Sequence, residues 1–327
     1  MYKSFYKLRR NPFEITPDPS FLFPTSRHKE ALAALYYGVR RHKGFVVLTG
    51  EVGTGKTLLV RWLLQLLRGP DISYAYVFNS RLSSLEFLQF IAGDFGLPTS
   101  AKTKSELLLE FGRFLTTRHQ QKLTTVLVVD EAHHLSTEVL EEIRLLTNLE
   151  TEEGKLLQIL LIGQPELDEK LDLLELRQLK QRIALRALLG PLDLEETKGY
   201  IERRLQLASA SSAAVDLFPD ETVAEIYRHS KGIPRLINTI CENALITAYA
   251  RQLMTIPIDI INEVAKDFRL NVTQRPEAEK VTSHDNREDE PANNLLQLYK
   301  YPRNSRSKEQ QVPSASTPGA SKHEPYI

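Results

Sequence analysis

Between residues 26 and 163 the spacing of hydrophobic positions changes repeatedly from one period to another. Short runs rich in leucine, β-branched and aromatic residues predict buried strands at residues 45–49, 73–79, 124–129 and 156–163. Longer segments with apolar positions three or four apart predict helices at residues 26–41, 58–67, 84–95, 105–118 and 137–149. Ser26 is the expected N-cap of the first helix. This alternation favours an α/β fold in which helices cover a mostly parallel sheet.

The pattern changes after residue 190. Helical spacing continues at residues 194–207, 220–230, 234–252 and 258–268, with no strand predicted among them. We therefore expect four parts, namely a leader with a helix (1–44), an α/β core (45–190), a small all-helical domain (191–270) and a tail (271–327). The tail is rich in proline, serine and asparagine, and its few apolar side chains cannot offset the entropy of ordering, which predicts disorder. Its apolar patch at residues 294–299 fits either a nascent helix or a docking peptide.

Residues 50–57 match the phosphate-loop pattern G-x-x-x-x-G-K-[ST] at every position. The motif lies between a predicted strand and a predicted helix, which is the context that it requires. Glycines let successive backbone N–H groups point at a phosphate, and the helix N-terminus adds partial positive charge. The alternative is a glycine-rich turn that contains lysine and threonine by chance, and it leaves the flanking strand and helix unexplained.

The residue types in this loop predict that the chain binds ATP and Mg²⁺. Lys56 can reach the β- and γ-phosphates, and the Thr57 hydroxyl can ligate the metal ion. The expected nucleotide-binding residues of the loop are Gly50, Glu51, Val52, Gly53, Thr54, Gly55, Lys56, Thr57 and Leu58.

Two adjacent carboxylates, Asp130 and Glu131, end the predicted strand at residues 124–129. Asp130 would hold Mg²⁺ together with Thr57, and Glu131 would polarise the attacking water as general base. The alternative is an acidic helix start, but carboxylates at the end of an apolar strand need a partner. Residues 130–133 also spell the Asp-Glu-Ala-His box of one helicase class, which requires two motor domains and therefore a longer chain.

A third strand of the predicted sheet ends at Gln164, whose amide could contact the γ-phosphate and the attacking water. The same Gly-Gln-Pro sequence also occurs in ordinary turns. Arg182 precedes the change to the helical domain and could face a neighbouring subunit, with Arg177 and Arg186 as alternatives for that role. Arg235 opens a helix of the small domain. Each of these arginines could equally be a solvated surface residue.

Composition restricts the class of protein. The 42 basic and 42 acidic residues balance, so no overall field points to nucleic acid or anionic lipid. The single cysteine, Cys241, excludes an internal disulfide and fits a buried small side chain in a reducing compartment. No apolar run reaches the roughly 18 residues of a membrane span, and the basic N-terminus lacks a signal-peptide core. We expect a soluble cytoplasmic protein, which a partner could hold at the inner membrane.

In chain order, the phosphate loop, Asp130-Glu131, Gln164, Arg182 and Gly-x-Pro-Arg at residues 232–235 resemble the motif set of AAA+ ATPases. The resemblance implies a RecA-like P-loop NTPase core with a helical lid at residues 191–270, and a nucleotide bound at a subunit interface. It implies that Gln164 is sensor 1, Arg182 the arginine finger acting in trans and Arg235 the sensor 2 arginine. It also implies that the leader folds over the base, where Phe13 and Arg27 are candidate adenine contacts, or equally a core residue and a helix-start charge.

The N-terminal half narrows the resemblance to the ExeA (general secretion pathway protein A) family. The shared features are Asn-Pro-Phe at residues 11–13, Pro-Asp-Pro at 17–19, Arg-His-x-Glu-Ala-Leu at 27–32, the phosphate loop, and Gly-Gln-Pro-Glu-Leu at 163–167. The family implies ATPases that assist assembly of a secretin or pilus-type apparatus. Many members carry a membrane span and a peptidoglycan-binding domain after the ATPase, and the tail of this chain resembles neither.

Two functional hypotheses follow. The first is an ATP-hydrolysing switch that forms a homo-oligomer and binds an envelope-assembly or secretion partner. It would assist assembly of a secretion, pilus or exopolysaccharide-export apparatus. The second is a DNA-dependent AAA+ ATPase that regulates transposition, which the fold permits but the balanced charge does not favour. A nucleotide-bound scaffold without catalysis is a third interpretation, and the presence of Glu131 argues against it.

Overall fold

We determined the architecture from a computed structural model, which describes residues 2–16, 18–78, 81–99, 103–152, 154–210 and 217–270. All of these residues belong to one unit, Met1–Thr273. The tail with its apolar patch at residues 294–299, for which we predicted disorder, lies outside the described residues.

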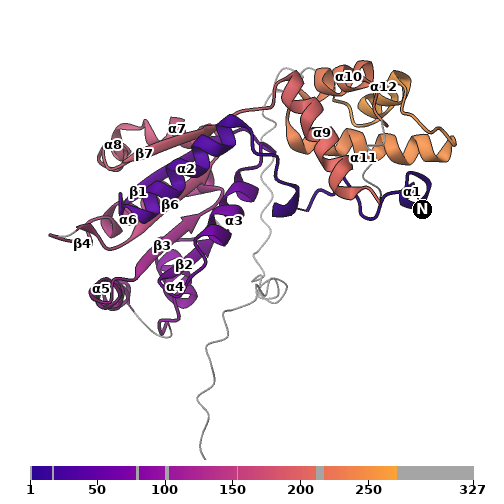
Figure 1. The fold of residues 1–327 in the computed structure, drawn as a ribbon. Coiled ribbons are helices and arrows are strands. Elements are labelled where there is room, and N and C mark those ends of the chain that lie inside the picture. The colour runs from indigo at the N-terminus through magenta and orange to yellow at the C-terminus, as the bar shows by residue number, and fades with distance from the viewer. Residues whose placement is uncertain are drawn as a thin grey trace, which may run out of the picture. The chain divides into compact units, whose positions relative to one another are not determined.

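The described part of the core contains a five-stranded sheet in the order β2-β3-β6-β1-β7 (Figure 1), in which every neighbouring pair is parallel. The strands are β1 (Phe45–Gly50), β2 (Ile72–Val77), β3 (Thr124–Val129), β6 (Gln158–Gly163) and β7 (Leu185–Leu189). A short antiparallel hairpin joins β4 (Glu150–Thr151) to β5 (Gly154–Lys155). The predicted α/β class with a parallel sheet is confirmed. Because the strands of the five-stranded sheet all run in one direction, their carboxyl ends meet at one edge of that sheet.

Helices cover both faces of this sheet, which is why its strands are almost uniformly apolar. Alternate residues of β1 point to opposite sides: Phe45 and Val47 belong to one hydrophobic cluster, and Val46 and Leu48 to another. One face packs against α2 (Ser26–Arg40) and α3 (Lys56–Leu66). The other face packs against α4 (Ser84–Asp94), α5 (Lys104–Gln120), α6 (Thr137–Leu146), α7 (Glu166–Leu171) and α8 (Arg177–Lys180).

The residues after β7 form a separate hydrophobic cluster built by helices. These helices are α9 (Leu194–Ala208), α10 (Asp220–Ser230), α11 (Pro234–Ala250) and α12 (Ile258–Asp267). The leader contributes to the same cluster through Tyr6, Leu8 and Phe13, and its helix α1 (Tyr2–Phe5) contacts α11. Phe13 is fully buried and packs edge-on against Phe218, which favours the core alternative over an adenine contact for this residue.

Two local predictions were wrong, and one strand was missed. The N-cap of α2 is Thr25, whose side chain accepts the His28 N–H, and not Ser26. The sequence did not predict β7, because leucine, arginine and alanine are good helix formers and only pairing with β1 makes this segment a strand. The helix predicted at residues 137–149 ends at Leu146, and the chain then enters the β4–β5 hairpin.

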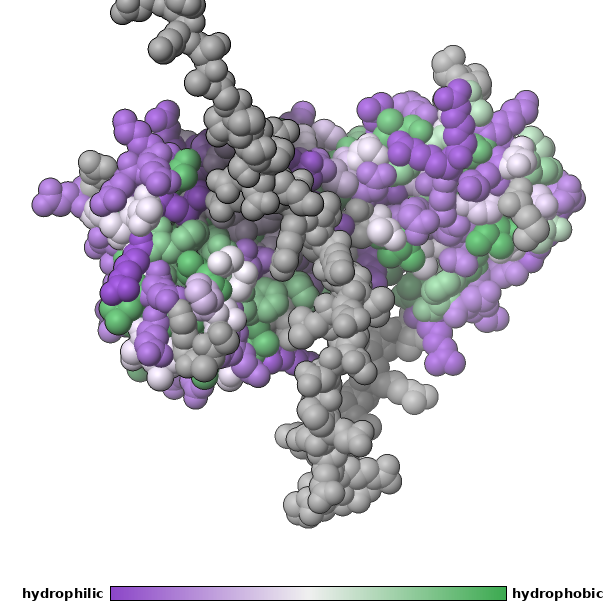
Figure 2. Space-filling model, turned by 90° about the horizontal axis from the view of Figure 1, so that it is seen from below, coloured by the Kyte–Doolittle hydropathy of each residue, from purple (hydrophilic) through white to green (hydrophobic). Residues whose placement is uncertain are grey.

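The face of the molecule shown in Figure 2 is mainly hydrophilic, with hydrophobic residues gathered in separate patches. The large apolar side chains that are most exposed among the described residues are Leu174, at 84%, and Leu188, at 65%. Scattered apolar residues of this kind are ordinary on protein surfaces. No helix within the described ranges has the length and hydropathy of a membrane span. Cys241 is buried as expected, and burial raises the pKa of its thiol.

Candidate nucleotide site

The phosphate loop connects the end of β1 to the start of α3. Gly53 and Gly55 have φ angles of 81° and 98°, in the left-handed region that side chains disfavour, so the backbone favours glycine at both positions, although the pattern itself fixes only Gly55 of the two. The loop closes on itself, because the Thr54 side chain donates to the Glu51 carbonyl at 2.8 Å. At the base of the loop, a Cβ on Gly50 would lie 2.3 Å from the Leu189 carbonyl oxygen of β7. The backbone curl expected from the motif is therefore present.

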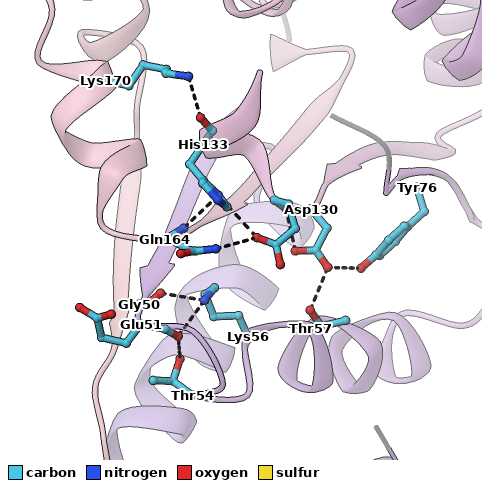
Figure 3. A network of polar contacts seen from close by, with 11 residues as sticks. Gly50, Glu51, Thr54, Lys56, Thr57, Tyr76, Asp130, His133, Gln164 and Lys170 are labelled. Carbon is cyan, nitrogen blue, oxygen red and sulfur yellow. Dashed lines mark hydrogen bonds and ion pairs between the residues drawn. The ribbon is translucent and has the colours of Figure 1, made fainter. Parts of the chain in front are cut away.

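Lys56 lies in the curl of this loop (Figure 3) and is only 7% exposed. Its ammonium donates to the Gly50 carbonyl at 2.7 Å and to the Glu51 carbonyl at 2.9 Å. Burial lowers the pKa of Lys56, while the carboxylates of Glu131 and Asp130 oppose that shift. The site therefore has one cation at the loop and two anions near it.

Thr57 and Asp130 meet where α3 begins and β3 ends. The Thr57 hydroxyl donates to Asp130 Oδ2 at 2.9 Å, and the Tyr76 hydroxyl donates to the same oxygen at 2.7 Å. The other oxygen of Asp130, Oδ1, accepts the backbone N–H of Glu131 at 2.9 Å. A hydroxyl and a carboxylate oxygen are hard donors of the kind that Mg²⁺ takes together with nucleotide phosphates, so this pair fits that ion.

Glu131 occupies the left-handed region at φ 53° and ψ 37°, which is unusual for a non-glycine residue. Its side chain is 45% exposed and makes two long polar contacts of 3.5 Å, to Gln164 Nε2 and His133 Nδ1. The Gln164 backbone N–H also donates to His133 Nδ1, at 3.4 Å. Strained backbone of this kind is frequent at functional sites. The structure thus brings the expected base and the expected sensor amide together.

Lys170 of α7 fastens the turn that carries Glu131. Its ammonium donates to the His133 carbonyl at 2.6 Å (Figure 3) and to the Leu135 carbonyl at 2.8 Å. Both acceptors belong to η2 (Ala132–His134) or directly follow it. Burial lowers the pKa of Lys170, and it lowers the pKa of His133, where the neighbouring His134 acts in the same direction.

The first turn of α11 contacts the phosphate loop directly. The Arg235 backbone N–H donates to the Gly53 carbonyl at 3.2 Å, and a Cβ on Gly53 would lie 2.7 Å from Arg235 Cβ. Pro234 stands at the first helical position, where its missing N–H costs nothing. Arg235 is therefore adjacent to the loop, as the sensor 2 expectation requires.

The three candidate finger arginines lie elsewhere in the core. Arg182 donates to the Thr147 hydroxyl at 2.7 Å, and Arg186, on β7, forms an ion pair with Asp168 at 2.5 Å. Arg177 is exposed at the start of α8. Within the described residues, none of the three has a side-chain hydrogen bond or ion pair to the phosphate loop or the acidic pair. These contacts do not select one arginine for the role.

His28 of α2 is a further neighbour of the loop. It is 5% exposed, its Nδ1 lies 2.8 Å from the Thr25 hydroxyl, and its Nε2 would lie 3.6 Å from a Cβ on Gly55. Burial lowers the pKa of His28, although a hydrogen bond with the Thr54 backbone opposes the shift. The leader thus contributes to the loop through His28.

Sequence reasoning missed Tyr76, Lys170 and His28. Tyr76 and Lys170 contact residues that are 54 and 37 positions away, and no local motif marks them. The strand prediction offered one signal for Tyr76, because it placed that tyrosine within the strand predicted at residues 73–79, but it did not predict that this strand pairs with the one before Asp130.

Comparisons with known proteins show what this chain is similar to. Residues 39–171 match the AAA domain family. General secretion pathway protein A of Aeromonas hydrophila is 46% identical over 252 residues, which is 77% of this chain and 45% of the relative. The chain thus spans about half the length of the curated relative that it matches.

Solved structures are similar in fold at much lower identity. The Aeropyrum pernix ORC2 protein has a TM-score of 0.58 at 18% identity, over 79% of this chain and 71% of that one. Drosophila ORC bound to DNA has a TM-score of 0.62 at 18% identity, over 82% and 66%. Sequence match and family model agree: the chain is an ExeA-like AAA+ ATPase, related to general secretion pathway protein A.

Proposed function

We propose that this chain binds ATP with Mg²⁺ in the phosphate loop, hydrolyses it, and works as an oligomeric switch. The observation that carries the proposal is the meeting of Thr57 and Asp130 at 2.9 Å, beside the buried ammonium of Lys56. Hydroxyl, carboxylate and ammonium are the three groups that a metal-bound triphosphate needs at this place.

Each of these side chains has a distinct role in the proposal. Lys56 binds the β- and γ-phosphates in place of the two carbonyls that it contacts in this structure. Thr57 and Asp130 hold the metal ion, which when bound neutralises charge on the phosphate oxygens. The loop amides between Gly50 and Leu58 hold the phosphates, with the N-terminus of α3 adding its dipole.

The groups beyond the phosphates provide the chemistry. Glu131 accepts the proton of the attacking water, and Gln164, 3.5 Å from it, orients that water and the γ-phosphate. Arg235, next to Gly53, senses the γ-phosphate from the helical domain. Closure of that domain over the loop would join ATP binding to a change of shape.

An arginine of a neighbouring subunit completes the site in the proposal. Arg182 is our first choice, with Arg177 and Arg186 as the alternatives, and a finger of this kind contributes on the order of 10³–10⁵ in rate. Arg182 would exchange its contact with Thr147 for the γ-phosphate of the neighbouring subunit.

The printed name of the relative supports a role beside a secretion apparatus. We propose that ATP turnover drives assembly of a secretion, pilus or exopolysaccharide-export apparatus through a protein partner. Because ATP is available in the cytoplasm, the chain would act there, held at the inner membrane by that partner.

Release of inorganic phosphate from Mg·ATP tests the enzymatic part. We expect turnover by the parent chain and none by Lys56→Ala, because the γ-phosphate loses its cation. Mixing Arg182→Ala with Lys56→Ala chains tests the oligomer, since mixed interfaces pair an intact site with an intact finger. Restored turnover in the mixture supports a finger in trans, and none restored counts against Arg182. Stimulation of the parent by duplex DNA across a salt series would favour the transposition-regulator alternative instead.

A further inference from the structure

Tyr76 contributes a hydroxyl to a part of the site that the motifs leave unexplained. It stands on β2, the strand at one edge of the sheet, paired in register with Val128 of β3. Its hydroxyl reaches Asp130, two residues beyond that partner, and donates to Oδ2 at 2.7 Å (Figure 3). This is the oxygen that also accepts the Thr57 hydroxyl.

The three donors around Asp130 fix the orientation of its carboxylate. The Glu131 N–H binds Oδ1, while Thr57 and Tyr76 bind Oδ2 from two different elements. A carboxylate that is 6% exposed depends on such donors to replace its lost hydration and to stay in one rotamer. Among the contacts of the described residues, loss of the Tyr76 hydroxyl would leave Asp130 Oδ2 with one side-chain donor, the Thr57 hydroxyl.

The backbone of Tyr76 is itself held in place. Its N–H, on the outer edge of the sheet, donates to Asp94 Oδ2 at 2.7 Å, at the end of α4. One residue further on, the Val77 carbonyl accepts the Asp130 N–H at 2.9 Å. The β2 backbone is therefore held both at Tyr76 and at Val77, and this fixes the direction in which the phenol ring reaches Asp130. Support of this kind positions a group that holds a metal ion.

We propose that Tyr76 is a positioning residue for the Thr57–Asp130 pair and sets the affinity of the site for Mg²⁺-bound nucleotide. The inference rests on the proposed function, because it needs a metal ion at that pair. Side chains that hydrogen-bond to metal-holding carboxylates typically change metal affinity by about 10–100-fold when they are removed.

The substitution Tyr76→Phe tests this with the loss of one oxygen atom. Calorimetric titration of ADP would be run on the full chain twice, with excess Mg²⁺ and with EDTA. We expect the parent to bind ADP more tightly with Mg²⁺ than with EDTA. In Tyr76→Phe this Mg²⁺-dependent increase in ADP affinity should be smaller by a factor of at least about ten. Its affinity in EDTA should equal that of the parent, because the phosphate loop is unchanged.

Tyr74→Phe is the matched control. Tyr74 lies two residues earlier on the same face of β2, is 43% exposed and pairs in register with Val126. The Tyr74→Phe chain should bind ADP with the affinity of the parent, both with Mg²⁺ and with EDTA. Only a hydroxyl that acts through Asp130 separates the two variants in this way.

The outcomes are distinguishable. Parental affinity of Tyr76→Phe with Mg²⁺ overturns the inference and leaves the proposed function intact. An equal loss with Mg²⁺ and with EDTA also overturns it, because the tyrosine would then support the fold and not the metal pair. A parent chain whose ADP affinity is the same with Mg²⁺ and EDTA refutes the proposed metal site, and the inference with it.

Discussion

The phosphate loop and the turn after β3 lie at the same edge of the sheet, yet their geometry has different origins. In the loop, side chains bind carbonyls only a few residues away: Thr54 binds Glu51, and Lys56 binds Gly50 and Glu51. Two glycines with positive φ make this curl possible. The structure of the loop is thus encoded almost entirely within the loop itself.

The turn after β3 depends on distant segments. Asp130 is held by Tyr76 from β2 and Thr57 from α3, and the turn is fastened by Lys170 from α7. Glu131 sits in a strained conformation that its own sequence does not favour. The difference teaches that the phosphate-binding part of the site is local, whereas the metal-holding and catalytic part needs the assembled sheet. Variants of the two regions should therefore fail in different ways.

The largest effect should come from Glu131→Gln. The amide keeps the shape of the side chain but cannot accept a proton, so hydrolysis should fall by a factor on the order of 10²–10⁴. Nucleotide affinity should remain parental, because the loop is unaltered. Phosphate release and calorimetry measure the two quantities, and hydrolysis at the parental rate would remove Glu131 from the role of base.

In the loop, Gly53→Ala should impair binding itself. A side chain at φ 81° is strained by about 1–2 kcal/mol, and its Cβ would meet Arg235 at 2.7 Å. With overpacking of about 1–3 kcal/mol, ADP affinity should fall on the order of 10²-fold. Gly96→Ala is the control, since φ is 79° there but nothing lies within 4 Å. Gly96 lies outside the phosphate loop, so Gly96→Ala should bind ADP like the parent, and equal affinity in the two variants would contradict the predicted loss.

Lys170→Met should reduce the rate without reducing binding. Its two hydrogen bonds hold the turn that positions Glu131, and a charged hydrogen bond contributes about 1.5–3 kcal/mol, so kcat should fall at least about tenfold. KM should stay near the parental value, and Lys170→Arg should recover part of the rate. A change in KM alone, with kcat unaltered, would contradict this positioning role.

The smallest effect concerns pH and stability. Burial lowers the pKa of both His28 and His133 from the ordinary value of 6.5, so the unfolded chain binds protons more readily than the folded one. The stability that the neutral forms of His28 and His133 contribute to the folded state is therefore fully present above pH 6.5. It is lost as the pH falls through their lowered pKa values. Denaturant unfolding should show lower stability at pH 5.5 than at pH 7.5. His28→Gln should flatten that slope, and an unchanged slope would exclude His28 as its source.

The contrast between the two regions also explains what the sequence could predict. Strands β1, β3 and β6 were predictable because buried parallel strands are continuous apolar runs, and the loop because its glycines require one backbone path. Strand β7 was not, since its composition favours a helix until β1 pairs with it. Tyr76 and Lys170 were missed because their roles arise only when segments far apart in the chain meet.

Calorimetric titration of Mg·ADP into the chain of residues 1–327 tests the central claim most directly. The account predicts saturable uptake that weakens when EDTA removes Mg²⁺ and weakens again in Lys56→Ala. Folded protein that takes up no nucleotide, or takes it up equally with and without the metal ion and Lys56, would contradict it.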